Sequence, residues 1–261
     1  MVFGGALAKK TLTDVQMLDA LDNAGFDGVE LPSTGFVGQP ERIKEYRDYL
    51  KGSRLRVTCI DGMCNFVSRD PAVRAQGADA LREAIDMAVS LDCPLVLAAG
   101  SRLSGDIAPS EGRQMTADGL NACMDEAKEA GVALGIEDFG IAPTLQCAAR
   151  DCAAILDAAP GLVFVFDTGN FYFAGEDPLQ NLAALGHRTR HVHFKDWVKS
   201  DTPQIADVSG ALLGEGIIPN AELARRFKAQ GVTSFSLECG GPGEILDVAK
   251  KDIETLRGWL A

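Results

Sequence analysis

Short apolar runs alternate with longer amphipathic segments along the whole chain, and this alternation constrains the fold more than any other feature. Runs that are apolar throughout, such as LVLAA at 95–99 and LVFVF at 162–166, are typical of parallel strands covered by helices. The most regular helical segment begins at Asp70-Pro71, an N-cap followed by a first-turn proline, and continues to Leu91. The pattern predicts a protein of the α/β class.

The alternation predicts eight strands and eight helices, provided that a weak first strand within residues 2–7 is counted. The other strands are expected at 25–31, 55–60, 94–100, 132–137, 162–167, 190–197 and 232–238, and the helices at 14–23, 40–51, 70–91, 112–130, 144–158, 177–185, 220–230 and 244–260. Residues 199–219 form a longer connection of the kind that builds a lid or substrate loop.

The length of the chain and its lack of a linker favour one domain. The chain has 261 residues, and no Pro/Gly/Ser-rich segment divides it. This length matches the ~250 residues of a (β/α)8 barrel. We therefore predict a single (β/α)8 TIM barrel over residues 1–261. An open doubly wound sheet is the alternative, but no Gly-x-Gly-x-x-Gly turn follows an early strand.

Composition excludes several classes of protein. A formal net charge of −12 without a basic patch disfavours binding to nucleic acid. The seven cysteines are odd in number and contain no C-x-x-C pair, so neither a disulfide framework nor a cysteine zinc site is expected. No signal-peptide pattern and no apolar run of about 18 residues is present, so we expect a cytoplasmic protein without a membrane span. A homo-oligomer is compatible with the sequence.

Four consecutive predicted strands end in a residue that can bind a metal. These residues are Glu137, Asp167, His193 and Glu238, and each directly follows or closes an apolar run. Strand carboxyl ends converge at one mouth of a barrel. A single carboxylate at such a place is often a helix cap or turn residue. The joint pattern is harder to attribute to capping, and it predicts a metal site.

The predicted ligand set favours a hard or borderline divalent ion. Three carboxylates and one imidazole suit Mn²⁺, with Mg²⁺, Co²⁺ and Zn²⁺ as alternatives. Such a site can leave positions open for two neighbouring substrate oxygens. A ligand carboxylate can also keep one oxygen for proton transfer.

Other polar residues lie close to these strand ends in sequence. Lys195 shares a predicted strand face with His193, so it is expected either to contact a substrate oxygen or to form an ordinary salt bridge to Asp196 or Glu215. Asn170 is a candidate for binding a substrate hydroxyl, or is a turn residue. Trp197 is a candidate apolar wall against which a sugar ring could pack. Alternatively, it only packs against other side chains at the mouth of the predicted barrel. His191 lies deeper, and we expect it to be a buried, hydrogen-bonded residue rather than a fifth metal ligand.

The strand-end motifs resemble those of the xylose isomerase-like TIM-barrel superfamily, the sugar phosphate isomerase/epimerase group. The resemblance covers GIED at 135–138, FDTGN at 166–170, HVHFKD at 191–196 and SLE at 236–238, together with GFDGVEL at 25–31 and GEG at 214–216. It implies that the four strand-end residues bind the metal, and that Glu137 and Glu238 also act as acid/base carboxylates on opposite faces of the substrate. The chain departs from the group at Asn170 and Phe139, where many members carry histidine.

The resemblance and the ligand chemistry together predict a metal-dependent isomerase or epimerase. The substrate is expected to be a keto-sugar or related polyol, a small carbohydrate that reacts through a metal-stabilised enediolate. Loss of a β-substituent would instead give a dehydratase or lyase on a keto-inositol or keto-glycoside. A non-catalytic sugar-binding barrel subunit is a further alternative. A related DNA-repair endonuclease is disfavoured by the three histidines and the charge of −12. No phosphate-binding glycine loop is evident.

Overall fold

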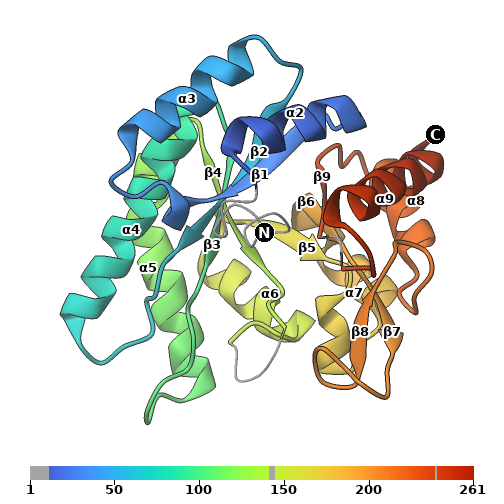
Figure 1. The fold of residues 1–261 in the computed structure, drawn as a ribbon. Helices are drawn as coiled ribbons and strands as arrows, with labels where there is room; N and C mark the ends of the chain where they lie inside the picture. Colours follow the sequence, from blue (N-terminus) through green and yellow to red (C-terminus); the bar gives the residue numbers. More distant parts are fainter. Residues whose placement is uncertain (1–11, 141–144, 239) are drawn as a thin grey trace. The chain divides into compact units, whose positions relative to one another are not determined.

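The computed structural model describes residues 12–140, 145–238 and 240–261, which form two compact units (Figure 1). One unit is Gly28–Val165, and the other combines the residues up to Asp27 with Phe166–Ala261. The first strand predicted within residues 2–7 lies outside the described residues. The prediction of one domain over residues 1–261 stays a prediction.

The Gly28–Val165 unit consists of parallel strands that pair in chain order. The strands are β1 (Gly28–Pro32), β2 (Arg56–Met63), β3 (Leu95–Ala99), β4 (Ala133–Glu137) and β5 (Val163–Asp167). The connections contain the short helix η1 (Ser33–Gly35) and the helices α3 (Pro40–Lys51), α4 (Pro71–Ser90), α5 (Pro109–Glu129) and α6 (Ala149–Ala158). Buried Cys59, Leu95, Leu97 and Val165 pack together as part of its core. Asp70 caps α4 by accepting the Ala72 N–H at 2.8 Å, as the sequence predicts.

The second unit contains the end of β5 and the remaining elements. They are α2 (Asp14–Ala24), η2 (Asn170–Ala174), α7 (Pro178–Leu185), η3 (Gly186–Arg188), β6 (Thr189–Phe194), β7 (Asp196–Lys199), β8 (Val208–Ala211), α8 (Asn220–Ala229), β9 (Phe235–Leu237) and α9 (Ile245–Leu260). The neighbour of β5 in the sheet is β6, which pairs in parallel with β9. Arg257 of α9 forms an ion pair of 2.9 Å with Asp27, which ties the two segments of this unit together.

The eight predicted helices are all present in the described part of the chain. Two of them begin three or more residues away from the predicted position. Helix α5 begins at Pro109 rather than at residue 112, because proline is well suited to the first turn. Helix α6 begins at Ala149, and residues 145–148 are bends, so the prediction of helix from residue 144 is wrong there. Residue 144 itself lies outside the described residues. None of the described helices has both the length and the apolar character that a membrane crossing requires.

The described strands differ more from prediction than the helices do. Strand β2 continues past the predicted end at residue 60, because Asp61 and Gly62 pair with Leu97 and Ala98 of β3. Strand pairing thus overrides the Asp-Gly turn signal. Strand β9 covers only three residues of the predicted 232–238, and Glu238 directly follows it.

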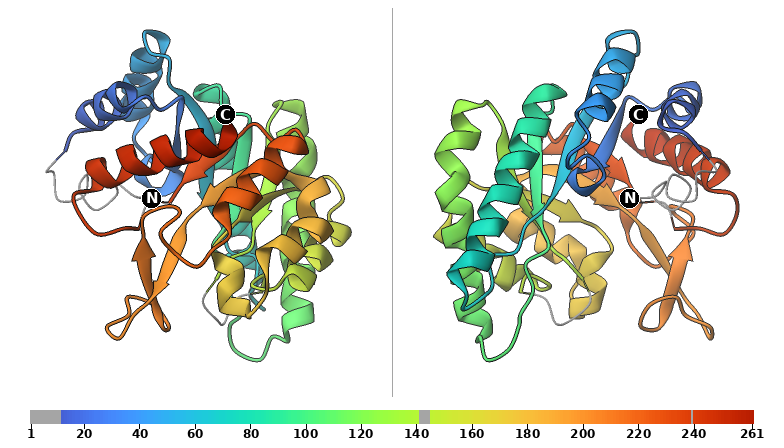
Figure 2. Two further views of the ribbon diagram at one scale, coloured as in Figure 1. Left: turned by 90° about the vertical axis from the view of Figure 1, so that its right-hand side faces the viewer. Right: turned by 60° about the vertical axis from the view of Figure 1, so that its left-hand side comes forward.

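The segment 190–197 was expected to be one strand, and this prediction is wrong. Strand β6 ends at Phe194, and Lys195 connects it to β7. Strand β7 forms an antiparallel hairpin with β8, and β8 lies inside the region 199–219 that was predicted to be a long connection. Figure 2 shows this hairpin extending away from α9 of the same unit. Lys195 therefore lies between strands β6 and β7, and Trp197 lies on β7.

Candidate metal centre

Asp167 is the last residue of β5, and the turn that follows holds its carboxylate in place. Its Oδ1 atom accepts the backbone N–H groups of Gly169 and Asn170, both at 2.8 Å. The Asp167 side chain is fully buried. Hydrogen bonds to a buried carboxylate favour its charged form and compensate part of its lost hydration. The turn therefore presents an oriented carboxylate at the end of the strand.

His193 and Glu238 come together because β6 and β9 pair in parallel. Nδ1 of the buried His193 lies 3.4 Å from Oε1 of Glu238. The Glu238 backbone N–H donates to the carbonyl of Phe194 at 2.9 Å, which continues the pairing past the end of β9. One potential ligand atom from each of Asp167, His193 and Glu238 lies within 4.8 Å of the others. Three of the predicted ligands thus form a compact group.

Lys195 carries the positive charge next to this group. Its Nζ lies 2.8 Å from Oδ2 of Asp167 and 2.5 Å from Oε2 of Glu238. It also donates a hydrogen bond of 3.2 Å to Oδ1 of Asn170. The Lys195 side chain is only 12% exposed. Sequence reasoning placed Lys195 near the site, but it did not identify two predicted ligands as its ion-pair partners.

The local charges decide the ionisation state of Glu238. Burial by itself raises the pKa of this carboxyl group, but the electrostatic effects of nearby Lys195 and His193 outweigh burial and lower the pKa to about 2. Glu238 is therefore ionised at neutral pH. An ionised carboxylate is the form that binds a metal ion or accepts a proton.

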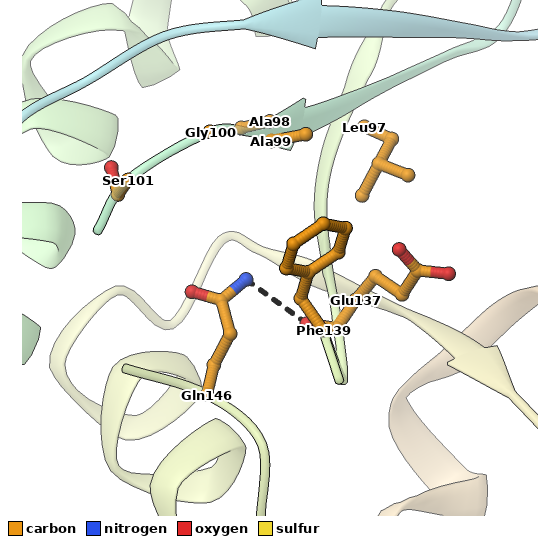
Figure 3. Close-up of a pocket in the computed structure, with 8 residues that line it drawn as sticks. All are labelled: Leu97, Ala98, Ala99, Gly100, Ser101, Glu137, Phe139 and Gln146. Atoms are coloured by element: carbon orange, nitrogen blue, oxygen red, sulfur yellow. Dashed lines mark hydrogen bonds between the residues drawn. The ribbon is translucent and has the colours of Figure 1, made fainter. Parts of the chain in front are cut away.

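Glu137 is the last residue of β4 and belongs to the Gly28–Val165 unit. It is buried, and its backbone carbonyl accepts a hydrogen bond of 3.0 Å from Nε2 of Gln146 (Figure 3). The backbone carbonyl of Gln146 in turn accepts the N–H of Phe139 at 3.1 Å. These bonds fix the chain just beyond the strand. Glu137 and Phe139 line a small pocket with Gln146, Ser101 and the end of β3. The metal and acid/base roles of Glu137 stay predictions.

Asn170 and Trp197 lie next to the turn that holds Asp167. The Asn170 side chain is buried and accepts the bond from Lys195 described above. The Trp197 indole Nε1–H donates to the carbonyl of Gly169 at 3.0 Å. The indole ring packs edge-on against Phe173, with 5.6 Å between ring centroids. Their predicted substrate contacts stay predictions.

The prediction that His191 is buried and hydrogen-bonded is confirmed. It has no exposed surface, and its Nδ1 lies 2.6 Å from Oγ of Ser234. The His191 ring packs edge-on against the His193 ring, with 5.1 Å between centroids. His191 therefore supports the predicted ligand from within the sheet.

Asp196 supports the site, whereas the sequence suggested it only as a possible salt-bridge partner of Lys195. Its buried carboxylate accepts four backbone N–H groups at 2.9–3.1 Å, from Trp197, Gly214, Gly216 and Ile218. A Cβ atom on Gly216 would lie 2.1 Å from Oδ1 of Asp196, so only glycine fits there. The Gly-x-Gly spacing at 214–216 was a signal for a close backbone approach, although it did not identify the partner.

The potential ligand atoms of Asp167, His193 and Glu238 fit a divalent metal ion. Asp167 and Glu238 supply charged oxygens and His193 supplies a nitrogen, a combination used for Mn²⁺, Zn²⁺ and similar ions. The buried backbone contacts of Asp167 and the ring contact of His193 are the kind of supporting interactions that orient metal ligands.

Comparison with known proteins identifies a family for this chain. Residues 18–259 match the family described as xylose isomerase-like TIM barrel. A search of the curated proteins finds no match.

Three solved structures illustrate the similarity of the fold. The IOLI protein with a bound zinc atom is 15% identical, with a TM-score of 0.80 over 93% of this chain and 91% of that chain. D-psicose 3-epimerase with D-tagatose from Clostridium cellulolyticum is 15% identical, with a TM-score of 0.78 over 95% and 94%. The probable 3-DHS dehydratase AsbF from Bacillus anthracis is 17% identical, with a TM-score of 0.77 over 94% of each chain. The predicted α/β TIM-barrel fold is thereby confirmed.

Proposed function

Because the chain belongs to the xylose isomerase-like TIM-barrel family, we propose that it is a divalent-metal-dependent isomerase or epimerase acting on a keto-sugar or related polyol. The observation that carries the proposal is the group formed by Asp167, His193 and Glu238, whose potential ligand atoms lie within 4.8 Å of one another. A structural role alone does not require two carboxylates and a buried histidine to meet at strand ends.

Glu137 is proposed as the fourth metal ligand. The support is its position as the last residue of β4 and the resemblance of the GIED motif to that of the family. Mn²⁺ is the expected ion, with Mg²⁺, Co²⁺ and Zn²⁺ as alternatives. When bound, a divalent ion supplies Lewis-acid polarisation of a carbonyl group, which is worth several kcal/mol of charge stabilisation in such sites.

Glu238 and Glu137 are proposed as the acid/base pair. One of them removes the proton from the carbon next to the carbonyl. The resulting enediolate is reprotonated on the other face of the same carbon, or at the neighbouring carbon with transfer of the hydroxyl proton from one oxygen to the other. The first outcome is epimerisation, and the second is isomerisation. Glu238 is ionised at neutral pH, which is the form that a base requires, while the charge of Lys195 that lowers its pKa also weakens it as a base.

Asn170, Trp197 and Lys195 are proposed to contact the carbohydrate. Trp197 uses its polar N–H in the bond to Gly169, so a sugar would meet the apolar part of the indole. Asn170 and Lys195 present polar groups next to the predicted ligands. A small neutral carbohydrate suits this combination of polar groups and one aromatic ring.

Metal analysis combined with solvent deuterium exchange tests the proposal. The purified protein is analysed for bound metal and then incubated in D₂O with a panel of keto-sugars, keto-inositols and keto-glycosides. We expect a bound divalent metal and the entry of deuterium at the carbon next to the carbonyl of one substrate. The Glu238→Gln and Glu137→Gln variants should lose this exchange.

The same experiment separates the alternative functions. Elimination of water in place of a sugar isomer would assign a dehydratase, the activity named for one of the structural neighbours. Metal and ligand binding without deuterium entry into any substrate would contradict an enzymatic role, and would favour a sugar-binding protein. Lack of a bound metal after loading with each of the four ions would contradict the proposed site.

A further inference from the structure

We propose that Lys195 is a positioning residue that regulates metal affinity, because its ammonium group bridges Asp167 and Glu238 and therefore competes with a metal ion for their oxygens. The inference rests on the metal site proposed above. It assigns to Lys195 a role in addition to its proposed substrate contact.

The contacts of Nζ carry the inference. Nζ lies 2.8 Å from the Asp167 carboxylate and 2.5 Å from that of Glu238, so one ammonium group bridges two proposed ligands. The Asp167 side chain is fully buried. Ion pairs that bury a carboxylate contribute far more than ion pairs on the surface when one partner is removed. Lys195 therefore keeps the two carboxylates together despite their mutual repulsion.

The path of the Lys195 side chain is restricted by its surroundings. A Cβ atom on Gly169 would lie 2.4 Å from Cγ and 3.0 Å from Cδ of Lys195, so the aliphatic stem passes directly over this glycine. The Lys195 backbone carbonyl accepts a hydrogen bond of 2.9 Å from Nδ2 of Asn220. Its backbone N–H donates to Oγ1 of Thr168 at 3.3 Å. The stem and the backbone of Lys195 are thus both held in place.

The two oxygens of Asp167 have different partners. Oδ1 accepts the backbone N–H groups of Gly169 and Asn170, whereas Oδ2 faces the ammonium group of Lys195. A divalent ion that approaches Oδ2 therefore meets a positive charge already in contact with that oxygen. Like charges a few ångströms apart repel strongly in a poorly hydrated site. Metal binding then requires Nζ to move away from Oδ2. The free energy that this movement costs lowers the apparent affinity of the site for the metal ion.

Replacing Lys195 by methionine tests the competition directly, because the stem is kept and the charge is removed. Mn²⁺ affinity is measured by calorimetry on chelator-treated protein. We expect Lys195→Met to bind Mn²⁺ at least about 10-fold more tightly than the wild type, since a repulsive charge is gone. The same variant should melt earlier by roughly 5–10 °C without metal, because Asp167 loses its counter-cation. A variant with only a structural defect would bind the metal more weakly.

Three further variants complete the experiment. Lys199→Met makes the same change at a lysine whose side chain is 61% exposed, and it should leave Mn²⁺ affinity unchanged. Lys195→Arg keeps the charge and should bind Mn²⁺ within a few-fold of the wild type. Lys195→Gln is measured as well, in case the methionine variant does not fold. Unchanged or weaker Mn²⁺ binding by every folded neutral variant at position 195 would overturn the inference.

Failure of this inference is distinguishable from failure of the proposed function. If wild-type protein and Asp167→Asn protein both bind no Mn²⁺, the metal site itself is wrong, and the role of Lys195 falls with it. If the wild type binds Mn²⁺ and Asp167→Asn does not, the site stands. In that case, the Mn²⁺ affinities of the neutral Lys195 variants decide by themselves whether Lys195 competes with the metal.

Discussion

The buried carboxylate of Asp196 accepts the backbone N–H of Gly216 at 3.1 Å, across twenty positions of the chain. With its three other N–H partners, this carboxylate joins the start of β7 to the turn before α8. Lys195 directly precedes Asp196 in the chain. The hydrogen bonds of Asp196 therefore hold both the turn at Gly216 and the backbone next to Lys195.

Asp196→Asn should destabilise the protein by about 2–4 kcal/mol, because an amide replaces a charged acceptor of four backbone donors and directs an N–H group at some of them. The free energy of unfolding, from urea denaturation followed by circular dichroism, measures the effect. Asp201→Asn makes the same change at an exposed residue and should stay within about 0.5 kcal/mol of the wild type. Equal stability of the two variants would contradict the support role.

Asp167→Asn should reduce the affinity for Mn²⁺ by about 100-fold or more, since the fully buried ligand loses its charge while its size is unchanged. Calorimetric titration of chelator-treated protein gives the dissociation constant. Asp125→Asn, an exposed residue of α5, is the matched control and should bind Mn²⁺ as the wild type does. Equal affinities of the two variants would exclude Asp167 as a ligand.

The contribution of Glu238 to stability should depend on pH in the metal-free protein. Its folded pKa of about 2 lies below the ordinary value of 4.5, so the stabilising effect is fully present above pH 4.5. The effect should be lost as the pH falls toward 2, because the carboxylate becomes protonated in both states. Melting temperatures of wild type and Glu238→Gln, measured from pH 7 to pH 2, should therefore converge at low pH. A difference that stays constant over this range would contradict the pKa assignment.

Three buried cysteines should not react in the folded protein. Burial raises the pKa of Cys64 and of Cys93 to about 12, and that of Cys59 well above its ordinary value. A raised pKa leaves almost no reactive thiolate at pH 8. Labelling with a thiol reagent followed by peptide mass spectrometry should leave these three residues unmodified until denaturant is added. Half-buried Cys147 should be modified earlier. Rapid labelling of Cys59 in native protein would contradict the burial of β2.

The neighbourhood of the site could be predicted from the sequence only in part. The strand-end residues Asp167, His193 and Glu238 were identified because an apolar run followed by a polar residue is a local pattern, and parallel strands bring such ends together. The ion pairs of Lys195 could not be identified in this way. They depend on where the chain leaves β6, and β6 ends earlier than the alternation of residues suggested.

The sequence by itself determined the α/β alternation, the helices and the predicted ligand residues, because hydrophobic periodicity, proline and capping residues act over a few neighbouring positions. Only the tertiary structure decided how far β2 extends, that β7 and β8 form a hairpin, and that Asp196 holds the turn at Gly216. These features depend on hydrogen bonds and packing between residues distant in sequence. Such pairings override local turn signals because buried backbone groups must find partners.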